Sequence, residues 1–193
     1  MSVAKRLIQR IATVLIDEYR LNWVVASTHH PVVVIQARDV VFAPLTTAHW
    51  PSLDQSSTAK MSNSLSYARA GLAGFAMLAD GIPLSVAHFA GRAHYDRDGT
   101  WLLRDGDVAL MDIATEESAR GRGLAVRLIA DATAHYRAAG ADRLIAFIWW
   151  SNRPSLRAFA KAGWRKIGLS FEYRRGDAWR SIRIPLATAA IRS

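Results

Sequence analysis

The sequence contains no cysteine, and this absence excludes several kinds of chemistry at once. A chain of 193 residues without cysteine has no disulfide bond, no thiolate ligand for a metal and no cysteine nucleophile for an acyl-enzyme. Acidic residues are also scarce, with 16 Asp and Glu against 25 Lys and Arg, which gives a formal net charge of +9. Such an excess of positive charge favours an anionic ligand.

Long apolar runs are missing as well. No stretch is long enough to cross a bilayer, and the N-terminus lacks the pattern of a cleavable signal, so we expect a cytoplasmic protein. The pair His29-His30 has no acidic or histidine cluster near it in the sequence, so we expect no metal site. With 51% apolar and 21% charged residues, the composition is that of a folded protein, and the length predicts one domain over residues 1–193.

The first 27 residues carry apolar side chains at intervals close to the helical period, among them Leu7, Ile11 and Leu15. The pattern predicts an amphipathic helix over residues 1–27, outside the rest of the domain. Its apolar stripe fits packing on the domain or on a second copy in a homodimer, or contact with a membrane surface. Nucleic acid is a further partner for so basic a chain, although no dedicated nucleic-acid motif is present.

The remainder alternates between strand and helix signals. Two apolar runs around Asp80-Gly81 predict a β-hairpin with a type I′ turn. Residues 51–70 suggest one or two short helices. The other expected elements are strands at 107–115 and 144–150, helices at 124–139 and 155–162, and a final hairpin of 164–173 with 178–185. This order predicts a mixed α/β fold.

A glycine-rich turn joins the strand at 107–115 to the following helix. Its sequence is Arg120-Gly121-Arg122-Gly123-Leu124-Ala125. Glycines let a backbone approach a ligand closely, and the free N–H groups of a helix N-terminus attract anions, so the turn predicts a phosphate or pyrophosphate site. A tight turn without a ligand is the other interpretation. The dinucleotide-binding fingerprint and the Walker loop are both excluded by the residues that follow Gly123.

Two segments resemble the GNAT superfamily of N-acyltransferases. Arg120, Gly123 and Ala125 match its acyl-coenzyme A signature of Arg or Gln, two residues, Gly, one residue, and Gly or Ala. A second segment is similar to the family's Asn-x-x-Ser/Ala and Lys-x-Gly-Phe elements; it consists of Asn152-Arg153-Pro154-Ser155 followed by Lys161-Ala162-Gly163-Trp164. The resemblance covers residues 72–185.

The resemblance implies a mixed, largely antiparallel sheet flanked by helices, and acetyl-CoA as the acyl donor. The resemblance also implies that the donor binds to the glycine turn and to the backbone of Ile113, Ala114 and Thr115 in the preceding strand. It also implies pantetheine contacts for Asn152 and Ser155, for which helix capping is the alternative. Lys161 would reach a coenzyme phosphate or would simply be solvated.

The general base is the least determined role. Asp112 is the first candidate, because a carboxylate inside an apolar strand must be desolvated or partnered. Asp107 stands where some family members keep a glutamate base, and His88 and His94 offer imidazoles on the preceding hairpin. Deprotonation by bulk water and a purely structural ion pair of Asp112 are the remaining alternatives.

One position departs from the family pattern. Phe159 occupies the place where many relatives have a tyrosine that protonates the leaving thiolate, and phenylalanine has no proton to donate. Water or Tyr173 would have to replace it. The leading hypothesis is an acetyl-CoA-dependent N-acetyltransferase that acts on a small amine or on an amino-sugar-like acceptor. A non-catalytic acyl-CoA sensor and a basic protein that binds membranes or nucleic acid are the alternatives.

Overall fold

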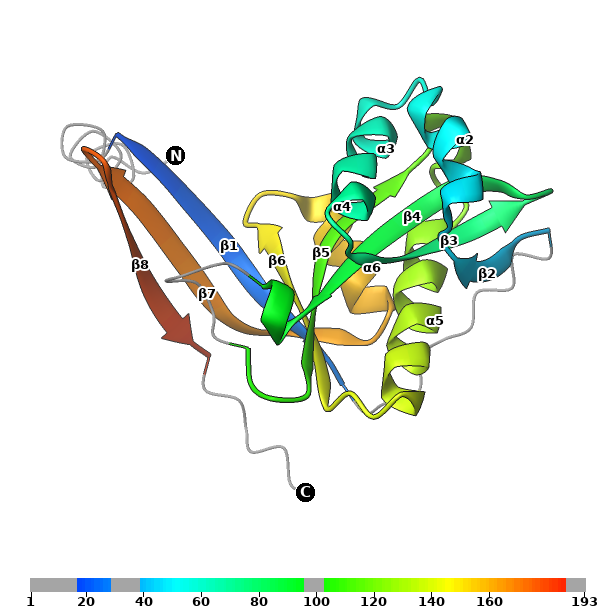
Figure 1. Cartoon of the computed structure of the whole chain (residues 1–193). Coiled ribbons are helices and arrows are strands. Elements are labelled where there is room, and N and C mark those ends of the chain that lie inside the picture. Colours follow the sequence, from blue (N-terminus) through cyan, green and yellow to red (C-terminus); the bar gives the residue numbers. More distant parts are fainter. Residues whose placement is uncertain (1–16, 29–38, 96–102, 187–193) are drawn as a thin grey trace.

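A computed structural model describes residues 17–28, 39–95 and 103–186, which form a single eight-stranded sheet in the order β2-β3-β4-β5-β6-β1-β7-β8 (Figure 1). Only β5 and β6 pair in parallel; the other neighbours are antiparallel. The strands are β1 (Glu18–Ser27), β2 (Val41–Pro44), β3 (Ala73–Ala79), β4 (Ile82–Gly91), β5 (Asp107–Thr115), β6 (Arg143–Trp149), β7 (Trp164–Arg175) and β8 (Ala178–Pro185). The helices are α2 (Trp50–Asp54), α3 (Ala59–Asn63), α4 (Leu65–Arg69), α5 (Leu124–Ala138) and α6 (Arg153–Lys161), with short 3-10 turns η1 (Thr47–His49), η2 (Arg92–His94) and η3 (Glu117–Ala119).

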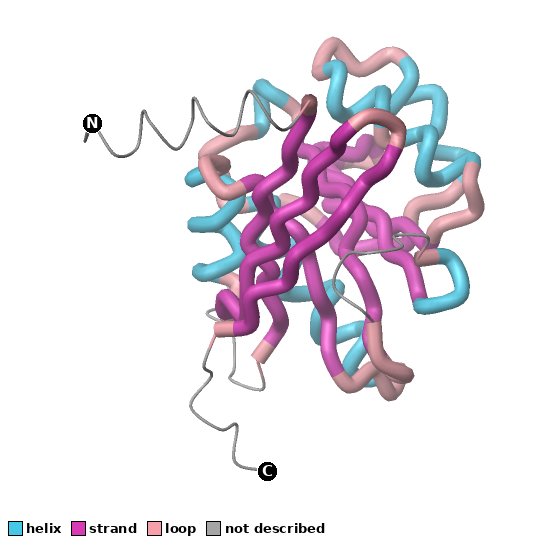
Figure 2. The backbone as a smooth tube through the Cα atoms, turned by 90° about the vertical axis from the view of Figure 1, so that its left-hand side faces the viewer, coloured by secondary structure: helices cyan, strands magenta, loops and turns pink. Residues whose placement is uncertain are grey.

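Helices cover both faces of the sheet (Figure 2). Successive strand residues point to opposite faces, so the apolar residues of β4 divide between two clusters. Val86 packs with α2, α3 and α4, whereas Ala87 belongs to the larger cluster under α5 and α6. Because both faces are buried, the sheet centre tolerates little movement of its strands. Among the described residues, no helix is long and apolar enough to cross a membrane.

Most elements expected from the sequence are confirmed. The hairpin of β3 and β4 turns through Asp80 and Gly81 with φ of 48° and 79°, the positive values that a type I′ turn requires. The strand at 107–115, the helix after the glycine turn, the following strand, the short helix and the last hairpin all form within a few residues of their expected bounds. The segment at 51–70 holds three short helices rather than one or two.

The prediction of a helix over residues 1–27 is wrong for its C-terminal part, because Glu18–Ser27 form strand β1. Residues 1–16 lie outside the described residues, as does His29-His30. β1 pairs antiparallel with β6 on one side and β7 on the other, so it lies inside the sheet, and Figure 1 shows it alongside β7. Val24 and Val25 are buried on opposite faces. Residues 23–26 are apolar at every position, which suits a strand covered on both faces, and here that pattern outweighs the helical spacing.

The sheet opens between β5 and β6. The two strands pair only from Asp107 with Arg143 to Leu110 with Ala146, and beyond these residues they diverge. On its other edge β5 remains paired with β4, but His88 lies opposite Asp112 and Phe89 opposite Leu110, which leaves Met111 as the extra residue of a β-bulge. A bulge bends its strand and redirects the next side chains. The site described below lies in this opening.

The burial of β1 predicts unequal costs for two valine substitutions. Val24 is 0% exposed, whereas Val41, on the edge strand β2, is 65% exposed. We expect Val24→Ala to lower the free energy of unfolding by about 2 kcal/mol, because buried methyl groups are lost and a cavity remains. The control Val41→Ala should change it by less than about 0.5 kcal/mol. Urea denaturation measures both; equal small effects would contradict the central position of β1.

Candidate functional site

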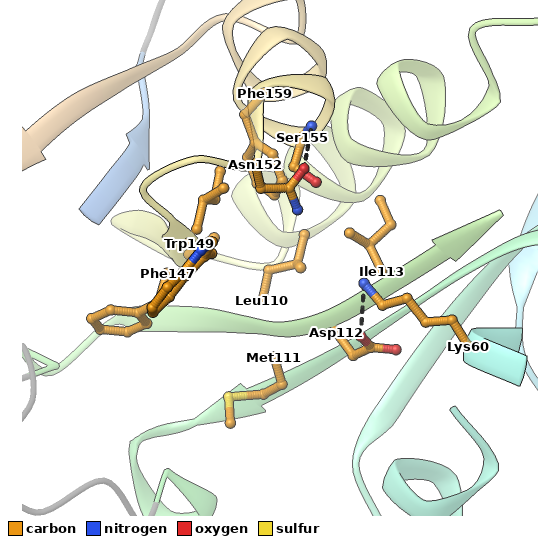
Figure 3. Close-up of a pocket in the computed structure, with 12 residues that line it drawn as sticks. Lys60, Leu110, Met111, Asp112, Ile113, Phe147, Trp149, Asn152, Ser155 and Phe159 are labelled. Carbon is orange, nitrogen blue, oxygen red and sulfur yellow. Dashed lines mark hydrogen bonds and ion pairs between the residues drawn. The ribbon is translucent and has the colours of Figure 1, made fainter. Parts of the chain in front are cut away.

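A pocket occupies the opening between β5 and β6 (Figure 3). One wall comes from β5, the other from β6, and the N-terminal part of α6 closes the end. The lining residues are Lys60, Leu110, Met111, Asp112, Ile113, Ala146, Phe147, Ile148, Trp149, Asn152, Ser155 and Phe159. Most of these residues are apolar in type, and the ion pair of Lys60 with Asp112 and the side chains of Asn152 and Ser155 supply polar groups.

The backbone of β5 is paired on one side only along the pocket. Ile113, Ala114 and Thr115 pair with β4, and Ser85 Oγ donates a hydrogen bond of 2.9 Å to the Ala114 carbonyl. Beyond Leu110 the opposite edge of β5 has no pairing with β6. Backbone N–H and C=O groups along such an edge need partners, and an extended ligand with amide groups supplies them as an added strand would.

The glycine turn lies where β5 leads into α5. Gly121 and Gly123 have φ of 80° and 78°, so both occupy the left-handed region that glycine adopts without strain. Gly123 is the N-cap of α5, and the N–H of Arg127 donates to its carbonyl at 3.0 Å. The N–H groups before Arg127 in the first turn have no partner within the helix. A Cβ added at Gly121 would meet open space, which leaves room for a ligand.

Two arginines bring positive charge to this turn. Arg120 is exposed and forms a 2.8 Å ion pair with Glu117, which is also exposed. Exposed pairs contribute little stability, so an incoming phosphate competes readily for Arg120. Arg122 is exposed beside it. Together with the N-terminus of α5, they concentrate positive charge at this turn, which is the electrostatic environment that an anion favours.

Glu116 is a residue that the sequence analysis missed. It follows β5 and accepts hydrogen bonds from the hydroxyls of Ser56 and Thr58, while Thr58 Oγ1 also accepts from the N–H of Glu117 at 3.0 Å. Burial alone would raise the pKa of Glu116, but these hydrogen bonds and the charge of Arg120 lower it overall. The carboxylate therefore ties the loop before α3 to the glycine turn. About sixty residues separate the partners, so no local pattern reveals the contact.

Asp112 lies in the pocket, as the leading base candidate should. Its side chain is 13% exposed, and Oδ1 lies 3.5 Å from Nζ of Lys60, which reaches over from α3. Figure 3 shows this pair facing across the mouth of the pocket. No sequence pattern predicted a role for Lys60, because only the packing of α3 on the sheet brings this residue to the pocket.

His88 lies directly opposite Asp112 on β4 but does not line the pocket. It is fully buried and stacks with Tyr67 at 5.7 Å between ring centroids. Neither ring nitrogen has a hydrogen-bond partner among the described residues. Burial lowers the pKa of His88, while the negative charge of Asp112 acts in the opposite direction. The imidazole is therefore neutral at pH 7, behind the carboxylate.

The other two base candidates lie elsewhere. Asp107 is buried at the paired end of β5, where its carboxylate binds Arg143 at 3.0 and 2.6 Å and accepts the N–H of Arg104 at 2.8 Å. These partners satisfy the carboxylate, and Asp107 does not line the pocket. His94 sits on η2 and is exposed. We assign Asp107 to an ion pair that fixes β5 against β6.

Helix α6 contributes the polar and aromatic end of the pocket. Asn152 caps the helix by accepting the N–H of Ser155 at 3.2 Å, and both residues also line the pocket. Phe159 is buried and packs edge-to-face on Trp164 at 4.9 Å between centroids. Lys161 is exposed at the end of α6 and does not line the pocket. No group of acidic or histidine side chains among the described residues is arranged to hold a metal ion.

Comparison with known proteins agrees with this geometry. The family model described as FR47-like protein matches residues 95–175, which contain β5, the glycine turn, α5, β6 and α6. No curated protein sequence matches the chain.

Solved structures share the fold at low sequence identity. A GNAT-family acetyltransferase from Novosphingobium aromaticivorans is 18% identical, with a TM-score of 0.60 over 84% of this chain and 67% of that one. One from Colwellia psychrerythraea is 14% identical, with a TM-score of 0.58 over 96% of this chain and 63% of that one. The aminoglycoside N-acetyltransferase AAC(6')-Iy, solved in complex with CoA, is 20% identical, with a TM-score of 0.52 over 77% of this chain and 98% of that one.

The chain thus spans about two thirds of the length of the first two relatives. The sheet that opens between β5 and β6, the glycine turn at the N-terminus of α5 and the FR47-like segment all occur in one region of the molecule. The chain therefore has the fold of these GNAT acetyltransferases, and its residues 95–175 match the FR47-like family model.

Proposed function

We propose that the protein is an acetyl-CoA-dependent N-acetyltransferase that acts on a small-molecule amine. The observation that carries the proposal is the divergence of β5 and β6, because it brings an unpaired strand edge and Asp112 to one pocket, next to the glycine turn. The CoA complex of the similarly folded AAC(6')-Iy supports a coenzyme of this kind.

The donor would bind in two parts. Its pyrophosphate fits the helix N-terminus at Gly121 and Gly123, where the N–H groups and Arg120 supply positive charge. Its pantetheine arm, which carries two amide groups, fits the free edge of β5 from Ile113 to Thr115. The thioester then reaches the pocket between the strands. These residues are the ones that the resemblance implied, and the geometry is consistent with it.

Acyl transfer also requires an amine without its proton. Asp112 is placed to take that proton at the pocket mouth, with neutral His88 behind it. The amine lone pair attacks the thioester carbonyl carbon, a C–N bond forms and the C–S bond breaks. A backbone N–H of β5 polarises the carbonyl oxygen. Phe159 donates no proton and Tyr173, on β7, does not line the pocket, so we assign protonation of the thiolate to water.

A non-catalytic acyl-CoA sensor is the second candidate, and Phe159 is the observation that favours it. The residue is buried against Trp164, so the place of the relatives' tyrosine is filled by an apolar ring. Such a protein would bind the coenzyme without releasing free thiol.

A panel of amines separates the two candidates. With acetyl-CoA present, we expect amino sugars or other small amines to cause release of free CoA thiol, measured by its reaction with a chromogenic disulfide. Calorimetry in the same buffer measures coenzyme binding. Binding without thiol release for any amine would favour the sensor, and absence of binding would contradict both.

A matched pair of glycine substitutions tests the anion seat. Gly121 and Gly140 have φ of 80° and 90°, and an added Cβ meets open space at both. Gly121→Val and Gly140→Val should therefore carry a similar backbone strain, of order 1–2 kcal/mol, measured by thermal unfolding. Only Gly121→Val places a side chain where the pyrophosphate would lie, so we expect at least a tenfold loss of acetyl-CoA affinity, about 1.4 kcal/mol, in that variant alone. Equal affinities would contradict the seat.

Substitution of the two aspartates separates the catalytic from the structural assignment. Asp112→Asn should lower kcat by about 100-fold, because a proton acceptor is lost, with little change in the free energy of unfolding. Asp107→Asn should lower the free energy of unfolding by about 3 kcal/mol, because Arg143 loses its charged partner. Steady-state kinetics and urea denaturation measure the two effects. The opposite pattern would reassign the base to Asp107.

A further inference from the structure

Lys60 places a primary amine in the pocket where the acceptor has to bind. Its Nζ lies 3.5 Å from Oδ1 of Asp112, the carboxylate that would deprotonate a substrate. We infer that Lys60 is an internal acceptor, and that the protein acylates this lysine intramolecularly from the acyl-CoA in its own site. The inference rests on the proposed function and adds a modification site to it.

The position of Lys60 follows from the packing of α3. The next residue, Met61, is 0% exposed and belongs to the cluster with Leu53 and Leu65 beneath α2–α4. This anchor fixes the backbone of α3 on the sheet. The Lys60 side chain is 58% exposed and extends from the fixed backbone toward β5, where it meets Asp112 (Figure 3). The amine is therefore held near the reaction centre by a side chain that remains free to change rotamer.

The other described lysines have different surroundings. Lys161 is exposed at the end of α6, and Lys166 is exposed on β7 with its Nζ 3.8 Å from the centroid of the Trp23 ring. Neither lines the pocket. The acylation rates of Lys161 and Lys166 therefore serve as the reference for the reaction of acyl-CoA with an exposed surface amine. Of these three lysines, only Lys60 has a carboxylate beside its amine and also lines the pocket in which the thioester would lie.

The chemical step is balanced without any further reagent. Asp112 takes one proton from the Lys60 ammonium, and the freed lone pair attacks the carbonyl carbon of the thioester. The new C–N bond replaces the C–S bond, the second amine proton is lost to solvent, and CoA leaves as a thiolate that is protonated by water. The product is an amide at Nζ without charge, so the ion pair with Asp112 is lost.

Proximity gives the reaction its advantage. A tethered amine beside its base reacts at a high effective concentration, whereas a surface lysine depends on collision. If Lys60 serves only as the ion-pair partner of Asp112, this advantage is absent, and Lys60 is acylated at the same rate as Lys161. The two roles therefore predict different rates at the same residue.

The experiment uses the full chain and acetyl-CoA with no added amine. Intact mass spectrometry follows the gain of one acetyl group, and peptide mapping assigns it. We expect Lys60 to be labelled at least about tenfold faster than Lys161 in the same sample, at a rate that does not depend on protein concentration. Asp112→Asn should reduce labelling of Lys60 to the rate of Lys161 and leave Lys161 unchanged. Lys60→Arg should remove the fast phase.

Three outcomes would overturn the inference. Labelling of Lys60 no faster than Lys161 would show that proximity gives no advantage, and a rate proportional to protein concentration would show transfer between molecules. Fast labelling that persists in Asp112→Asn would exclude the stated base. Thiol release with added amines is measured in parallel. Turnover without fast labelling of Lys60 defeats this inference alone, whereas absence of coenzyme binding defeats it together with the proposed function.

Discussion

The separation of β5 from β6 is the constraint on which the rest of the site depends. Parallel pairing ends at Leu110 and Ala146, and the bulge at Met111 turns β5 away from its neighbour. Backbone groups beyond this point lack the partners that a continuous sheet would supply. One backbone irregularity therefore creates the pocket, the unpaired edge of β5 and the placement of Asp112 together.

An opening in a sheet needs support on both sides, and this protein obtains it from different elements. Asp107 and Arg143 join β5 to β6 at the paired end of the two strands, three residues before the opening, through two charged hydrogen bonds. On the far side of β6, β1 fills the sheet and pairs with β7 as well. Glu116 ties the loop before α3 to the glycine turn. The glycine turn and the walls of the pocket are therefore held by residues that do not themselves line the pocket.

His88 shows how much the site departs from ordinary core packing. A fully buried imidazole whose two nitrogens lack partners among the described residues costs free energy that an apolar side chain would not. Such local conflicts are expected where function sets the residue. Its ring lies directly opposite Asp112 on the neighbouring strand. Lys60 in turn is the only cation that lines the pocket among the described residues, so the charge of Asp112 is balanced from α3.

The sequence by itself determined the elements whose signals are local. Asp80-Gly81 specified a turn because its backbone angles suit few other residues, and the glycine turn with α5 followed from residues adjacent in the chain. The placement of Asp112 on a central strand near the proposed donor site was also predictable. These features depend on turn chemistry and on apolar periodicity, which short segments encode.

Only the tertiary structure decided which distant segments meet. The run at Glu18–Ser27 satisfied helical spacing, and its identity as strand β1 depended on a slot between β6 and β7 that forms from residues more than a hundred positions away. The pairs Lys60 with Asp112 and Ser56 with Glu116 depend equally on how α2 and α3 pack over the sheet. Local pattern cannot encode such contacts, because their free energy comes from burying two faces together once the chain has folded.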